Sequence, residues 1–176
     1  MAVADSLNPG VRRRELLGWA FYDFANSGYT TVVLTAVFNA YFVGVVAGGA
    51  SWATFAWTLT LAVSSLIVAV ISPPLGAWAD RSAARKRLLL ITTLGCVVST
   101  ALLSSAGPGT LVVAVALVIA SNVFYCIGES VIASFLPDLA RPGAIGRVSG
   151  WGWGVGYFGG MLTLGVFPTL APYYLP

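Results

Sequence analysis

Histidine is absent from this sequence of 176 residues, and charged residues are scarce. Only 9% of the residues are charged, whereas an ordinary soluble domain carries about 25%. This composition excludes a typical water-soluble fold, and the lack of histidine excludes catalysis by an imidazole. The two cysteines, Cys96 and Cys126, lie in apolar runs without the spacing of a disulfide framework or a metal site. No metal ion or cofactor is therefore expected.

The sequence is instead rich in apolar residues, which make up 58% of it and raise its mean hydropathy to +0.88. Five apolar stretches are long enough to cross ~30 Å of hydrocarbon as helices. They cover residues 16–46, 52–79, 88–106, 110–136 and 148–171. We therefore predict an all-α membrane protein with five transmembrane helices, and lipid as its surroundings.

The basic residues predict the orientation of these helices. All nine lie before the first stretch, between the second and third, or between the fourth and fifth: Arg12, Arg13, Arg14, Arg81, Arg85, Lys86, Arg87, Arg141 and Arg147. Positive residues accumulate on the cytoplasmic side of membrane proteins. Residues 1–15 are thus predicted to be cytoplasmic and residues 172–176 to form an external tail, in a bacterial plasma membrane. This placement accounts for the basic character of the chain, so no nucleic-acid partner is expected.

A polar stripe marks the inner end of the first stretch. Its members recur at helical spacing and so share one face of a helix: Asp23, Asn26, Ser27 and Thr30. The helical rise places Asp23 about 10 Å inside the membrane. The stripe could hydrogen-bond to neighbouring helices, with Asp23 snorkelling or paired with an arginine. Alternatively it lines a water-filled path, since an intramembrane acid costs about 2.5–3.5 kcal/mol on insertion scales.

A second acid, Glu129, lies in the fourth stretch at nearly the same predicted depth as Asp23, about 12 Å from the cytoplasmic end. Two carboxyl groups at one level of a bundle can share a proton, which is chemistry that a proton-coupled carrier uses. Glu129 could equally be a structural donor in a local network. Ser130 beside it is a weak candidate nucleophile, and nothing else in the sequence suggests an enzyme.

The loop GAWADRSAARKRLLL, residues 76–90, joins the second and third stretches. It combines one glycine and one acid with a run of cations: Gly76, Asp80, Arg81, Arg85, Lys86 and Arg87. By itself such a loop is a topology anchor, in which Asp80 pairs with Arg81, Arg85 or Arg147. Gly76 would allow close approach of another helix.

Glycines recur every four residues at the start of the fifth stretch. They form two tracks on adjacent helix faces, Gly146, Gly150 and Gly154 on one and Gly152, Gly156 and Gly160 on the other. Small residues at this spacing let helices pack closely in lipid. We therefore predict a packing interface here, or alternatively a surface that slides during a conformational change.

These motifs together resemble the major facilitator superfamily of transporters. The loop is similar to the signature G-x-L-A-D-R-x-G-R-K between helices two and three, with Trp78 and Ala83 standing where that pattern has leucine and glycine. The segments FYDFANSGYTTVVLTAVFNAYF, FLPDLA and GRVSGWGWGVGYFGG resemble the branch that contains the vacuolar amino-acid effluxers and their bacterial relatives. The resemblance extends from Leu16 to about Val166.

The resemblance implies a fold and a function. The five helices would form most of one six-helix half of a twelve-helix transporter. The polar stripe and Glu129 would then face a central cavity, on the path of a substrate or a proton. The cytoplasmic gate would be formed by Gly76, Asp80, Arg81, Arg85, Lys86 and Arg147. The implied activity is secondary active transport of a small solute, such as an amino acid, linked to protons.

The five stretches account for fewer helices than the superfamily has, and three explanations stay open. The chain could be a fragment, a degenerate gene product, or a half-transporter that requires a homodimer or a second transporter half. A different class of function is a non-transporting assembly or regulatory subunit. Such a subunit would pack against its partner through the glycine-rich fifth helix.

Overall fold

The computed structural model describes residues 6–174, and the side chains of residues 6–166. The described part is helical, and apart from one isolated bridge between Leu7 and Ala140 it contains no β-structure. The chain divides into two compact units. Unit 1 comprises the residues up to Val37 and those from Ile132 on, and unit 2 comprises Phe38–Val131. The predicted all-α fold is confirmed.

Within the described part, four helical segments are long and apolar enough to cross a membrane: Arg13–Val46, Ala53–Arg81, Arg85–Ser105 and Leu111–Leu139. They match the first four predicted stretches closely. The fifth stretch forms α7 (Ile145–Tyr174), a helix of 30 residues. α7 is not among these four segments, so its membrane crossing stays a prediction.

The first span is not one regular α-helix. α1 (Arg13–Tyr29) is followed by a π-helical segment, Thr30–Ala36, then by α2 (Val37–Tyr41) and a second π-helical segment, Phe42–Val46. The first π-helical segment is rich in β-branched residues, which crowd the preceding turn. The Thr35 hydroxyl donates to the carbonyl of Thr30, five residues back, at 3.0 Å. The sequence analysis predicted a single continuous helix and missed these two wide turns.

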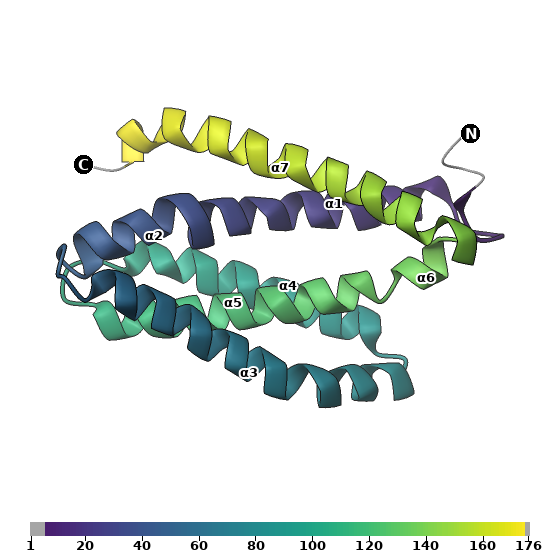
Figure 1. Cartoon of the computed structure of the whole chain (residues 1–176), viewed down its shortest axis with the longest axis horizontal. Coiled ribbons are helices and arrows are strands. Elements are labelled where there is room, and N and C mark those ends of the chain that lie inside the picture. Colours follow the sequence, from purple (N-terminus) through teal and green to yellow (C-terminus); the bar gives the residue numbers. More distant parts are fainter. Residues whose placement is uncertain (1–5, 175–176) are drawn as a thin grey trace. The chain divides into compact units, whose positions relative to one another are not determined.

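Unit 1 pairs α1 with α7, which lie side by side (Figure 1). Residues 6–12 precede α1 and run antiparallel to the loop around α6 (Leu136–Leu139); we call this segment the clasp. Asn8 holds the end of α6, where backbone carbonyls lack helical partners. Its amide side chain donates to the carbonyls of Pro137 and Asp138 at 2.9 and 3.0 Å, and its backbone N–H donates to Leu139 at 2.9 Å.

Apolar side chains fill the space beneath the clasp. Leu7 from the clasp, Leu16 from α1, Ala140 from the loop and Val148 from α7 are all buried together. The Trp19 indole adds a hydrogen bond of 3.1 Å to the carbonyl of Ile132. The clasp therefore links the start of α1 to the start of α7 through both backbone bonds and a small core.

Unit 2 contains α3 (Ala53–Arg81), α4 (Arg85–Leu102) and α5 (Leu111–Ala133). A buried polar bond ties α5 to α3, because Asn122 Nδ2 donates to Ser64 Oγ at 2.6 Å. Gly95 on α4 leaves room for the ring of Phe124, which would lie 2.7 Å from a Cβ at that position. A polar bond between small side chains at one contact and a glycine at the other let the helices of unit 2 pack closely.

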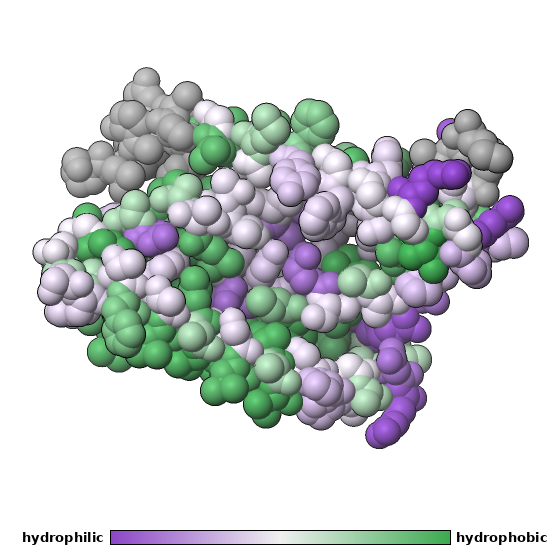
Figure 2. All heavy atoms as spheres, in the orientation of Figure 1, coloured by the Kyte–Doolittle hydropathy of each residue, from purple (hydrophilic) through white to green (hydrophobic). Residues whose placement is uncertain are grey.

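Large apolar side chains remain exposed along the helices of both units. Phe55 is 70% exposed and Val112 is 81% exposed. Figure 2 shows apolar residues over a large part of the visible face, while strongly hydrophilic residues occupy smaller areas. Such a surface is expected of helices that face lipid rather than water.

Candidate functional site

The candidate site begins at the seam between α1 and α7, where one glycine track faces α1. Each glycine of this track lies against a side chain of the first span: Gly152 against Trp19 and Gly156 against Asp23, both on α1, and Gly160 against Thr31 of the first π-helical segment. A Cβ at Gly160 would lie 3.0 Å from the Thr31 hydroxyl oxygen. Along this track α7 therefore lies close to the first span, within unit 1.

The second glycine track has no neighbour of this kind. A Cβ built at Gly146, Gly150 or Gly154 meets no other atom within 4 Å among the described residues. Gly159, which lies beside the first track, comes closest to the α1 backbone, since its Cβ would meet the carbonyl oxygen of Phe24. The two tracks therefore differ in role, which their identical spacing in the sequence could not reveal. A packing role for Gly150 and Gly154 stays a prediction.

Asp23 is the acid of this seam. Its side chain is half-buried, and its Oδ2 occupies the space that a Cβ at position 156 would need. No hydrogen bond or ion pair to this carboxyl group is found in the described part of the chain. The interpretation in which Asp23 pairs with an arginine is therefore not supported within residues 6–166. The carboxyl group instead faces the bare backbone of α7.

Two hydroxyl groups of the polar stripe bond to backbone carbonyls one turn earlier in the same span. The Ser27 hydroxyl donates to the carbonyl of Asp23 at 3.0 Å, and the Thr30 hydroxyl donates to that of Asn26 at 3.3 Å. All four stripe residues belong to unit 1 and are half-buried, and Thr30 begins the π-helical segment. The stripe thus occupies the second half of α1, where the glycines of α7 leave space.

Glu129 lies on α5, in unit 2, and is half-buried. Cys126, one turn earlier, donates to Asn122 Oδ1 at 3.8 Å, and Asn122 in turn bonds to Ser64. The sequence analysis missed Asn122 and Ser64, although an asparagine in an apolar stretch is itself a signal of a buried polar contact. Because Asp23 and Glu129 belong to different units, a common level for them stays a prediction.

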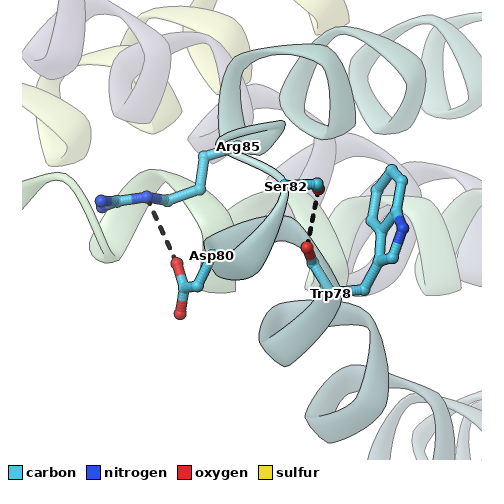
Figure 3. A network of polar contacts seen from close by, with 4 residues as sticks. All are labelled: Trp78, Asp80, Ser82 and Arg85. Atoms are coloured by element: carbon cyan, nitrogen blue, oxygen red, sulfur yellow. Dashed lines mark hydrogen bonds and ion pairs between the residues drawn. The ribbon is translucent and has the colours of Figure 1, made fainter.

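The predicted gate loop is stabilised by an ion pair. Arg85 Nε lies 3.3 Å from Asp80 Oδ1, and the Ser82 hydroxyl donates to the carbonyl of Trp78 at 2.7 Å (Figure 3). Of the three arginines that could pair with Asp80, the structure selects Arg85. The Asp80 side chain is 67% exposed, so the pair contributes at most about 1 kcal/mol to stability.

The predicted gate also includes Gly76, Arg81, Lys86 and Arg147. Arg81 and Lys86 are exposed, and no atom lies within 4 Å of a Cβ at Gly76 among the described residues. The close helix approach expected at Gly76 is therefore not seen. Arg147 belongs to unit 1, where its Nη1 donates to Ser6 Oγ at 3.5 Å. A gate role for these residues stays a prediction.

Ala83 adopts a backbone conformation that explains the glycine in the superfamily signature. Its φ is +49°, in the left-handed region, and it closes the turn between α3 and α4. The left-handed conformation costs a residue with a Cβ about 1–2 kcal/mol, and glycine avoids this cost.

We expect Ala83→Gly to raise the free energy of unfolding by about 1 kcal/mol, measured by thermal unfolding in a mild detergent. The matched control is Ala84→Gly, the same change at the next residue, where φ is negative. It should not stabilise the chain.

Comparison with known proteins identifies the family. Residues 39–146, more than half of the chain, match the profile of a family described as "Vacuole effluxer Atg22 like". The chain belongs to this family. Over 144 residues the Atg22-like chain is 30% identical to the uncharacterized MFS-type transporter YxiO of Bacillus subtilis (strain 168), a match that covers 80% of this chain and 34% of that relative. No solved structure matches it.

The match confirms the resemblance to the major facilitator superfamily. It covers the gate loop, α5 and Glu129, while Asp23 and most of α7 lie outside residues 39–146. The Atg22-like chain spans about a third of the length of its relative. Among the described residues, no group of three or more Cys, Asp or Glu could hold a metal ion.

Proposed function

We propose that this chain forms part of a secondary active carrier for a small solute, an amino acid, and that Asp23 couples transport to protons. The observation that carries the proposal is the half-buried Asp23 carboxyl group, which faces Gly156 without a cationic partner among the described residues. An acid inside a bilayer is costly and typically marks an ion or substrate pathway. Gain or loss of a proton at Asp23 would change the charge that faces α7.

The resemblance found in the sequence suggests the class of solute. The family is described as vacuole effluxers without a solute being named, and the segments of the chain resemble the amino-acid effluxers. We assign Asn26, Ser27, Thr30 and Glu129 to the path of the substrate or the proton, because their polar groups lie within apolar helices. The carrier would be completed by further helices, from a homodimer or from a second transporter half.

The proposal is tested by flux measurements on the complex as it exists in the membrane. The chain would be purified in a mild detergent together with any protein that accompanies it, sized, and reconstituted into liposomes loaded with a mixture of amino acids. We expect saturable flux of at least one amino acid that responds to an imposed pH gradient. Absence of flux for every amino acid, with and without the gradient, would overturn the proposal.

A second candidate is a non-transporting subunit that docks through α7. It is favoured by one observation, the open glycine track formed by Gly146, Gly150 and Gly154. Gly154→Leu fills this track without entering the seam with α1. Loss of an accompanying protein of different sequence would favour the subunit. Loss of both the homodimer and the flux would favour the carrier.

A further inference from the structure

The clasp brings five arginines to one end of unit 1. Three of them lie at the start of α1 and two flank the start of α7: Arg12, Arg13, Arg14, Arg141 and Arg147. All five are exposed. Only two acids accompany them among the described residues of this region, Glu15 and Asp138, and Glu15 Oε2 already accepts the backbone N–H of Arg12 at 3.0 Å. This end of unit 1 is therefore strongly positive.

Arg141 is held in place by the clasp rather than left free in solvent. Its Nε donates to the carbonyl of Leu7 at 2.8 Å, and its backbone N–H donates to the carbonyl of Ser6 at 3.0 Å. The two Nη groups have no other partner in the described part of the chain, and the side chain is exposed. A guanidinium fixed by its Nε offers a rigid fork for two oxygens of a phosphate.

Arg147 lies next to the same segment. Its Nη1 is 3.5 Å from Ser6 Oγ, and Ser6 is only 2% exposed. Two buried clasp residues thus hold the arginine side chains, Leu7 that of Arg141 and Ser6 that of Arg147, so less side-chain entropy is lost when an anion binds. Trp151 and Trp153 follow on α7 and are 37% and 67% exposed. Exposed tryptophans one or two turns from a cationic end are typical of the headgroup level of a membrane.

We propose that this end of unit 1 binds the headgroup of an acidic phospholipid. The lipid phosphate binds to the Nη fork of Arg141, and Arg147 and the arginines of α1 supply the surrounding positive potential. We favour a lipid over a soluble anion because the arginines lie at the start of the long helix α7, close to the exposed indoles of Trp151 and Trp153. Juxtamembrane basic clusters attract acidic lipids electrostatically. The clasp adds a fixed orientation of the Arg141 guanidinium to this general attraction.

The test is a titration of the purified full chain with single lipids, followed by native mass spectrometry. We expect phosphatidylglycerol to bind more tightly than phosphatidylcholine. Arg141→Lys keeps the charge but removes the fork and the Nε anchor, and should weaken phosphatidylglycerol binding about tenfold. The matched control is Arg13→Lys, the same change at an arginine that the clasp does not hold, and it should change binding by less than about twofold.

A second variant tests the clasp without altering any charge. Asn8→Ala releases the end of α6 and should also weaken phosphatidylglycerol binding, while the circular dichroism spectrum stays helical. If Arg141→Lys does not fold, Arg147→Lys takes its place. Equal effects of Arg141→Lys and Arg13→Lys, equal affinity for both lipids, or displacement of the lipid by millimolar inorganic phosphate would each overturn the proposal. The last result would indicate a site for a soluble anion.

Discussion

Gly159→Ala is expected to separate α1 from α7 and to destabilise unit 1 more than any other glycine substitution on α7. The added Cβ would meet the carbonyl oxygen of Phe24 and would lie 2.9 Å from its carbonyl carbon. These atoms belong to the α1 backbone and cannot rotate aside, so the helices must move apart. Overpacking of this kind costs about 1–3 kcal/mol. Thermal unfolding of the purified chain, followed by tryptophan fluorescence, measures the loss.

Two neighbouring glycines provide graded controls for this result. Gly156→Ala meets the Asp23 carboxyl group, which can turn away about its side-chain bonds, so we expect a smaller loss. Gly154→Ala points into open space and should change stability by less than about 1 kcal/mol. A Gly154→Ala loss as large as that of Gly159→Ala would contradict the described seam, because both changes add the same methyl group to the same helix.

Asp23→Asn is expected to abolish the dependence of flux on a pH gradient while leaving the helical fold intact. The amide has nearly the shape of the carboxyl group and fits the same space beside Gly156, but it cannot carry a proton. Because no cation pairs with Asp23 among the described residues, the substitution leaves no opposite charge unpaired there. The measurement is the initial rate of amino-acid flux in liposomes over a series of external pH values.

Asp138→Asn is the matched control for this experiment. It makes the same chemical change on the same unit, but at an exposed residue of α6, and it should leave the pH profile unaltered. An Asp23→Asn carrier with an unchanged profile would refute the coupling role. Glu129→Gln tests the shared proton predicted from the sequence. If one proton is shared, the double variant should lose no more coupling than either single variant.

The positions of the helices followed from composition alone, since a run of apolar residues long enough to cross a bilayer has few alternatives to a helix. The irregular helical geometry of the first span could not be predicted from composition. Its two π-helical segments arise where β-branched residues and hydroxyl-to-carbonyl bonds, such as Thr35 to Thr30, disturb the helix locally. Their hydropathy is that of an ordinary span, so a count of apolar residues does not detect them.

The candidate site could be predicted in its residue types but not in its contacts. The stripe with Asp23 was found from helical spacing, and the gate loop was found from its resemblance to a known signature. The clasp was missed entirely, because Asn8 and Leu139 lie far apart in the sequence and neither has an unusual pattern around it. The sequence limited the ion-pair partner of Asp80 to Arg81, Arg85 or Arg147. The turn at Ala83 then places Arg85 next to Asp80.

The sequence by itself therefore determined the class of protein and the family, because hydropathy and linear motifs are properties of each segment alone. Only the tertiary structure decided which of two equally spaced glycine tracks packs against α1, and that Asp23 faces Gly156 rather than a cation. The two tracks have the same composition and the same period. What distinguishes them is the neighbour each one meets, and that depends on how α1 and α7 are rotated toward each other when the chain folds.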